Sequence, residues 1–421
     1  MRKLASTILV AAMILLGGCE MDGESGGVTA LAKGGVKKVP ADKDLLTTPS
    51  PAPTPTVAVA PPSGGYVVSP TLNGEADLVS DFPVEQGLVR SWGTGAVPGL
   101  YGGGEGAFRL TCGAETPLRY DDPLVKPGQA GASHLHLFWG PTTIDANTTM
   151  GTLATSLGNS TCNYGAFTLN RSAYWAPALL DDAGYARNAD WIAVYYKQPM
   201  PTSARCTAGS ATFQGNCIGL PNQLRMVFGW DATHPDAPVT GASWYCTGGT
   251  GGHFHNLDDV FQSGCKAGDT LVADLLAPSC WDGKYLDTPD HRSHLAYAGY
   301  GSWGYLKCDA AHPYVIPQNE SKIAWTVTAD MYDASRTSRL HFSSDHMKTG
   351  AKAGETLHSD YMEQWVGKVK QMWQENCVAK GLDCSGGDLG NGLQLVGASK
   401  PSYGFVNPNP KSATTFPDMI M

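Results

Sequence analysis

The sequence predicts a mostly β fold with long loops and a few helices, resembling a sandwich or jelly roll and stapled by disulfide bonds. Short apolar or alternating segments of strand length recur along the chain between clusters of Gly, Asn, Asp and Pro, which favour turns. The chain also contains 11 cysteines and 11 tryptophans. Many cysteines together with many short strands are typical of an exported β domain whose core is braced by cross-links.

The strand pattern is clearest in five segments: residues 134–139, 191–196, 224–230, 270–275 and 323–329. One convincing helix is expected over residues 359–380. Its apolar residues recur at helical spacing, and Gly381 provides a stop; they are Tyr361, Trp365, Val369, Met372 and Trp373. Because strands far outnumber helices, layered sheets are the expected architecture.

The N-terminus has the pattern of a lipoprotein signal peptide. Arg2 and Lys3 precede an apolar run over residues 8–16, which is too short to span a bilayer but suits a signal peptide. Leu16-Gly17-Gly18-Cys19 resembles the lipobox read by lipoprotein signal peptidase. We therefore expect residues 1–18 to be removed and Cys19 to carry the lipid that anchors the protein in a membrane. The alternative is an ordinary secretory signal with an incidental cysteine.

Three further segments are expected after the signal peptide. Residues 19–75 contain the lipidated cysteine and a proline-rich tether without hydrophobic periodicity, which favours an extended spacer over a packed core. Residues 76–397 form a single globular domain, and residues 398–421 form a tail. Glu20 follows Cys19 in place of the aspartate associated with inner-membrane retention. An extracytoplasmic position at the outer membrane or cell surface is therefore favoured.

Charge and cysteine usage restrict the class of protein. The net charge is −9 and no basic block occurs, which argues against nucleic acid and against anionic lipid surfaces as partners. Setting Cys19 aside leaves an even set of cysteines, enough for five disulfides in an oxidising compartment. The expected short-range pairs are Cys206–Cys217, Cys246–Cys265 and Cys377–Cys384.

The histidines gather in short clusters that suggest a polar site. His134 and His136 are two residues apart, which on a strand places both imidazoles on one face, where they could share a metal ion. His291 and His294 lie beside Asp290, a carboxylate that could orient one of these rings. His358 and Asp360 fall at the start of the expected helix. The alternative is that each histidine packs in a loop and bonds backbone carbonyls.

Ordered motifs resemble the secreted domain of unknown function 1996. They are Phe108-Arg109-x-x-Cys112, Asp122-Pro123, Ser133-His134-Leu135-His136, Ser172-Ala173-Tyr174-Trp175-Ala176-Pro177, Leu224-Arg225-Met226, Pro278-Ser279-Cys280-Trp281-Asp282-Gly283-Lys284-Tyr285-Leu286-Asp287, Asp290-His291-Arg292-Ser293-His294-Leu295-Ala296-Tyr297 and Leu357-His358-Ser359-Asp360-Tyr361, followed by Trp365. The family occurs in secreted proteins, sometimes beside carbohydrate-binding modules, and brings no established chemistry. The chain departs from it at Phe138-Trp139-Gly140-Pro141, where the family has a small-residue segment.

The leading hypothesis is an extracytoplasmic hydrolase or lyase acting on a polysaccharide, with the link to sugar implied by the resemblance alone. Its catalytic residues would be Asp290, His291, His294, His358 and Asp360, working either as metal-free acids and bases or beside a divalent metal. His134 and His136 would bind that metal. Trp139, Trp281, Asp282 and Tyr297 would bind the substrate. The alternatives are a non-catalytic cell-surface protein that binds glycan or metal, and a purely structural envelope protein.

Overall fold

The structure is a computed structural model. It describes residues 67–68, 72, 74–91, 97–100, 104–113, 117–156, 160–162, 167–300 and 304–396. Contacts divide the chain into the units Met1–Ala60 and Pro61–Met421, and every described residue belongs to the second. The expected signal peptide, the lipidation site at Cys19 and the tail over residues 398–421 lie outside the described residues, as does most of the tether.

The described part is mostly β, with 34% strand arranged in several sheets and 11% helix. The larger main sheet has six strands. In spatial order they are β11 (Ala242–Cys246), β12 (Thr270–Leu276), β19 (Gln318–Thr326), β8 (Trp191–Pro199), β3 (Glu105–Cys112) and β22 (Asp383–Cys384). All neighbours are antiparallel except β22 and β3, which run parallel.

The second main sheet has five antiparallel strands. In spatial order they are β10 (Arg225–Gly229), β21 (His358–Met362), β6 (Ala173–Pro177), β5 (His136–Trp139) and β4 (Leu118–Arg119). The three central strands are buried along their whole length, which explains why their sequences read as apolar runs. Strand β5 is followed by Gly140, which has a φ of 104° and lies against the Ser172 carbonyl, where a Cβ atom would clash.

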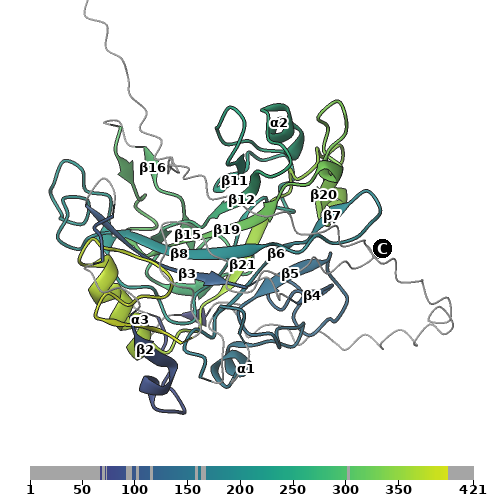
Figure 1. The fold of residues 1–421 in the computed structure, drawn as a ribbon. Helices are drawn as coiled ribbons and strands as arrows, with labels where there is room; N and C mark the ends of the chain where they lie inside the picture. Colours follow the sequence, from purple (N-terminus) through teal and green to yellow (C-terminus); the bar gives the residue numbers. More distant parts are fainter. Residues whose placement is uncertain are drawn as a thin grey trace, which may run out of the picture. The chain divides into compact units, whose positions relative to one another are not determined.

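The main core lies between the two large sheets. Phe108 and Tyr196 of the six-stranded sheet belong to the same apolar cluster as Trp139, Tyr174 and Tyr361 of the five-stranded sheet. The Tyr174 and Tyr196 hydroxyls are 2.5 Å apart, which links the sheets by a buried hydrogen bond. Figure 1 shows β8 and β3 of one sheet next to β21, β6 and β5 of the other. Face-to-face packing of this kind is a sandwich, as the sequence predicted.

A smaller core covers the other face of the five-stranded sheet. It contains Phe138, Trp175, Val227 and Met362 from four strands, Leu124 from the segment between β4 and β5, and Ile144 and Leu153 from the segment that follows β5. Helix α1 (Met150–Ala154) belongs to that segment and lies below the sheet in Figure 1. This second face matters because the histidine site lies at one end of it.

Small sheets and helices complete the described part. The sheets are β1 (Val67–Val68) with β14 (Tyr285–Asp287), β2 (Leu88–Arg90) with β23 (Leu393–Leu395), β7 (Leu179–Asp181) with β20 (Leu340–Phe342), β16 (Gly299–Tyr300) with β17 (Leu306–Lys307), and β15 (Leu295–Ala296), β13 (Cys280–Trp281), β18 (Tyr314–Val315) and β9 (Asn216–Cys217) together. The remaining helices are α2 (Leu257–Gln262) and α3 (Gly367–Trp373), with the π-helix Gln374–Val378 and the short 3-10 turns Val84–Gly87, Ala329–Met331 and Asp345–Met347. Across the described ranges, none of the helices combines the length and the apolar character needed to cross a membrane.

All five segments expected to be strands coincide with β5, β8, β10, β12 and β19, although β19 ends at Thr326. The predicted helix over residues 359–380 begins too early. Residues 358–362 form β21, because they hydrogen-bond between β10 and β6, and α3 starts only at Gly367. The apolar spacing from Tyr361 onward reflects burial in a sheet and then in a helix, which periodicity alone does not separate.

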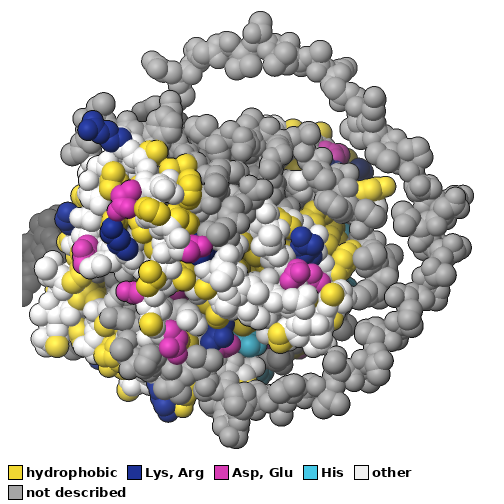
Figure 2. All heavy atoms as spheres, turned by 90° about the horizontal axis from the view of Figure 1, so that it is seen from below, with side chains coloured by type: hydrophobic (Ala, Val, Ile, Leu, Met, Phe, Trp, Pro, Cys, Tyr) yellow, Lys and Arg dark blue, Asp and Glu magenta, His cyan; other side chains and the backbone are white. Residues whose placement is uncertain are grey.

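Five disulfides staple the fold. The three expected pairs are confirmed: Cys206–Cys217, Cys246–Cys265 and Cys377–Cys384. The other two, Cys112–Cys162 and Cys280–Cys308, close longer loops. Basic, acidic and apolar side chains are interspersed on the face seen in Figure 2, without a large block of one charge.

Candidate metal centre

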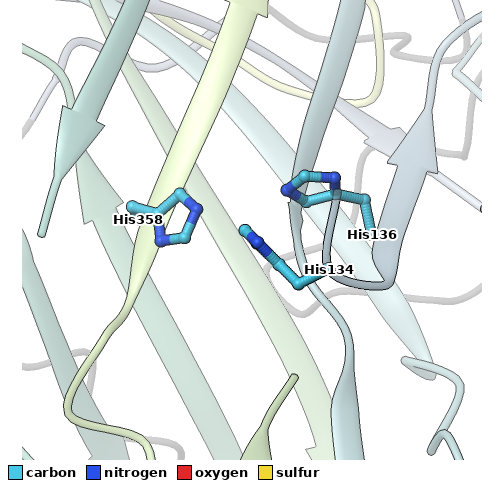
Figure 3. Close-up of side chains that lie close together, drawn as sticks. All are labelled: His134, His136 and His358. Carbon is cyan, nitrogen blue, oxygen red and sulfur yellow. The ribbon is translucent and has the colours of Figure 1, made fainter. Parts of the chain in front are cut away.

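Three histidines converge at one end of the five-stranded sheet. His136 lies at the start of β5, His134 lies two residues before it, and His358 opens β21, two strands away across β6. One ring nitrogen of each lies within 4.8 Å of one nitrogen of each of the others. The ring centroid of His134 is 4.1 Å from that of His136 and 5.2 Å from that of His358. Figure 3 shows the three imidazoles facing a common space.

Backbone carbonyls fix the orientation of two rings. Nδ1 of His136 donates to the Asp121 carbonyl at 2.9 Å, and Nδ1 of His358 donates to the Thr356 carbonyl at 2.8 Å. A carbonyl oxygen can only accept, so in the neutral ring Nε2 carries the free lone pair. Nε2 of His134 and of His136 is buried without a hydrogen-bond partner. A histidine that donates from one ring nitrogen to a carbonyl, and whose other ring nitrogen has an unengaged lone pair, has the arrangement of a metal ligand.

The surroundings keep these imidazoles neutral. Burial, together with the nearby His136 ring, lowers the pKa of His358 to about 3. Burial and the neighbouring imidazoles hold the pKa of His134 well below its ordinary value. Burial also lowers the pKa of His136, against an opposing effect of the Asp122 charge. A neutral imidazole is the form that binds a metal ion.

Asp360 is a buried carboxyl on the same strand as His358. It lies two residues after His358 on β21, so both side chains point to the same face of the sheet. Both carboxyl oxygens are buried without a hydrogen-bond partner. Burial and the charge of Asp122 raise the pKa of Asp360 well above its ordinary value. The charge of Arg292 acts in the opposite direction, and the oxygens of Asp360 are not among the three converging ligand atoms.

The donor set suits a divalent transition metal. Three imidazole nitrogens fit Zn²⁺, Cu²⁺ or Ni²⁺, whereas Mg²⁺ and Ca²⁺ prefer oxygen ligands. Three protein ligands also leave a fourth position for water or substrate, as in catalytic zinc sites. A second group of potential ligands, Cys246, Cys265 and Asp269, offers no such site, because the two cysteines are bonded to each other.

The second histidine motif supplies none of the three converging ligands and builds a turn. His294 is buried, with Nε2 2.8 Å from the Arg225 carbonyl and Nδ1 3.0 Å from the Thr288 hydroxyl. Nδ1 of His291 is 2.7 Å from a carboxylate oxygen of Asp287. The sequence predicted that Asp290 would orient one imidazole of this motif. The carboxylate that contacts an imidazole is instead Asp287, which holds His291.

Asp290 stabilises the same turn. Its Oδ1 accepts hydrogen bonds from the Thr288 and Ser293 hydroxyls and from the backbone N–H groups of Arg292 and Ser293. Burial acts to raise the pKa of Asp290, but these hydrogen bonds outweigh it and hold the pKa well below the ordinary value. The catalytic role predicted for Asp290 and His294 thus competes with a structural one that the hydrogen bonds already explain.

Arg292 is the residue of this motif that approaches the metal centre, and sequence reasoning missed it. Its guanidinium donates to the carbonyls of Gly229 and Trp230, at 3.3 and 2.7 Å, beyond the end of β10. The Trp230 ring lies 5.9 Å from the His358 ring. The feature of the sequence that could have indicated it is the position of this arginine between His291 and His294 along the chain.

The residues predicted to bind substrate are part of the framework. Trp139 and Trp281 are fully buried; Trp139 stacks on Tyr174 with ring centroids 5.9 Å apart, and Trp281 donates to the Tyr285 carbonyl. Neither ring offers a face to a sugar, so this prediction is corrected for both. Asp282 accepts from the amides of its own turn, at Lys284 and Tyr285. The Tyr297 hydroxyl donates to the Leu276 carbonyl, and its ring lines a surface hollow.

Comparison with known proteins identifies the family. No curated protein and no solved structure matches the chain. One family model, described as domain of unknown function DUF1996, matches residues 122–365. The matched region begins at Asp122, beside the metal centre, and it contains all three histidines as well as the 290–294 turn. Since it covers more than half of the sequence, the chain belongs to the DUF1996 family.

Proposed function

We propose that this protein is lipid-anchored at Cys19, faces the outside of the cytoplasm at the outer membrane or cell surface, and acts there as a metal-dependent hydrolase or lyase on a polysaccharide. The observation that carries the proposal is the convergence of three neutral imidazoles, two of them with buried and unpartnered Nε2 atoms. The choice of polysaccharide draws on the family resemblance described above.

In this proposal His134, His136 and His358 hold a divalent ion of the Zn²⁺ type. Such an ion polarises a bound oxygen and lowers the pKa of coordinated water. Asp360 and Asp122 offset the positive charge, and the carbonyls of Asp121 and Thr356 fix the rings.

His291 is the candidate proton acceptor. Its side chain is 19% exposed and is held by Asp287, which is the arrangement of a general base and its orienting carboxylate. Asp290 and His294 position the turn that carries His291 and Arg292.

The test starts from the purified chain, stripped of metal with a chelator and reloaded with Zn²⁺. Release of reducing ends or of unsaturated products is then measured on soluble β-glucan, chitosan, xylan and pectin. We expect product only from the reloaded protein, and none from His358→Ala. The control is His253→Ala, since His253 bonds Ser243 and stands outside the metal centre. Product release that persists after metal removal would contradict the proposal.

The second candidate is a non-catalytic protein that binds metal or glycan. It is favoured by the inaccessibility of the His134 and His136 Nε2 atoms, which suits tight ion binding more readily than turnover. Stoichiometric Zn²⁺ binding without product from any polysaccharide would support this candidate. Membrane anchoring is tested separately, because Cys19→Ser should move the protein from the membrane fraction to the soluble fraction without altering metal content.

A further inference from the structure

A hollow of about 560 Å³ opens on the surface, lined by residues outside the three-histidine group. It lies between the β16–β17 hairpin and the strands β9 and β18, and its lining includes Asn216, Tyr297, Tyr300, Lys307 and Asp309. Its volume falls in the range of small-molecule sites. None of its lining residues belongs to the three-histidine centre.

Tyr300 is the most exposed aromatic ring at this hollow. Its side chain is 80% exposed, and among the described residues no ring, cation or hydrogen-bonding group is paired with it. Lys307 and Asn216 are also exposed, and Lys307 has no ion-pair partner in the described part of the chain. The rim therefore offers one flat apolar face together with an ammonium and an amide group.

The walls of the hollow are braced on both sides. Cys206–Cys217 ties down β9, and Cys280–Cys308 joins β13 to the end of the hairpin. The backbone N–H of Cys308 donates to the Gln214 carbonyl at 2.8 Å, and the backbone N–H of Asn216 donates to the Pro313 carbonyl at 2.9 Å. A backbone fixed in this way lowers the ordering cost of binding, which then falls mainly on the exposed side chains.

We propose that this hollow binds a segment of a neutral polysaccharide, with the Tyr300 ring stacked on the apolar face of a pyranose. Asn216, Lys307 and Asp309 would bond its hydroxyl groups. A polyanion fits less well, because the carboxylate of Asp309 lies at the same rim as Lys307. A lipid chain fits less well because the rim is polar and open to water. The inference rests on the proposed function only for the class of substrate and requires no metal ion.

The experiment measures binding to the full chain by calorimetry with three probes: cellohexaose, chitohexaose and hexagalacturonic acid. We expect one of the two neutral probes to bind, and Tyr300→Ala to weaken that binding by about 10-fold. Tyr300→Trp keeps an aromatic face and should retain the affinity. Tyr185→Ala is the matched control, since Tyr185 is also an exposed tyrosine but lies at a separate turn.

The proposal is overturned if neither neutral probe binds, if the acidic probe alone binds, or if Tyr300→Ala and Tyr185→Ala bind equally well. His358→Ala separates this site from the metal centre. It should lose bound metal and keep the affinity for the neutral probe, so failure of the metal proposal leaves this one standing. Retained metal with lost sugar binding in Tyr300→Ala shows the converse independence.

Discussion

The two histidine motifs look alike in sequence and differ in what their nitrogens contact. In the first group, His134, His136 and His358, Nδ1 of His136 and of His358 donates to a backbone carbonyl, and the Nε2 atoms of His134 and His136 have no hydrogen-bond partner. At the second, both nitrogens of His294 have protein partners, and His291 is paired with Asp287. Clustering alone does not mark a binding site. An unfilled hydrogen-bonding capacity in a buried place does, because proteins seldom leave such groups unpaired.

The largest expected effect separates the two motifs by metal content. His136→Ala removes one of three ligands and should weaken Zn²⁺ binding by more than about 100-fold. His294→Gln, in the second motif, should bind Zn²⁺ like the unmodified chain. Competition with a chromogenic chelator measures both affinities. Equal metal binding by the two variants would erase the distinction.

Stability should respond in the opposite way. His294→Ala leaves the Arg225 carbonyl and the Thr288 hydroxyl without their buried partner and opens a cavity, which should cost about 2–4 kcal/mol in the free energy of unfolding. Metal-free His136→Ala should cost less, because it loses one hydrogen bond, to the Asp121 carbonyl, where His294→Ala loses two. Denaturant unfolding of the metal-free proteins makes the comparison. A smaller cost for His294→Ala than for His136→Ala would contradict it.

Two aspartates extend the contrast. Asp360→Asn keeps the shape of the side chain and removes a charge near the metal centre, so Zn²⁺ affinity should fall by about 10-fold. Metal-free stability should stay unchanged or rise, since no hydrogen bond to Asp360 is lost. The matched variant, Asp290→Asn, should leave Zn²⁺ affinity unaltered. A metal affinity that is insensitive to Asp360→Asn would remove the charge argument for this residue.

The smallest expected effect is a pH dependence at the second motif. The pKa of Asp290 is lowered in the folded protein, so the folded chain binds its proton less readily than the unfolded chain does. Asp290 therefore stabilises the fold above its unfolded pKa of about 3.9, and this contribution is lost as pH falls further. Asp290→Asn should cost about 1 kcal/mol at neutral pH, allowing for its partial exposure. Unfolding at pH 7 and pH 3 tests this, and a difference that grows toward pH 3 would contradict the sign.

Local patterns predicted much of this molecule. Residues 134–139 alternate and carry β-forming residues, so β5 and the shared face of His134 and His136 followed from spacing. The three short-range disulfides also followed, since short loops close readily.

Non-local contacts account for what could not be predicted. His358 appeared to begin a helix, and its place on β21 depends on hydrogen bonds to β10 and β6, which sequence spacing does not report. The burial of Trp139 and Trp281, which rules them out as substrate-binding residues, could not be predicted. It depends on packing partners distant in sequence, such as Tyr174 for Trp139. That the Nε2 atoms of His134 and His136 lack a hydrogen-bond partner likewise depends on the positions of all neighbouring donors and acceptors, which sequence does not give.

The position of β21 has a consequence for how the protein matures. This strand comes from late in the chain, yet it lies inside its sheet, between β10 and β6. A nascent chain that has not yet delivered residues 358–362 has His134 and His136 but no third histidine, and its sheet is split. Capture of the ion would therefore report that β21 has joined its sheet. A chain shortened before β21 should lack both the ion and the joined sheet, which makes metal content an assay for correct assembly.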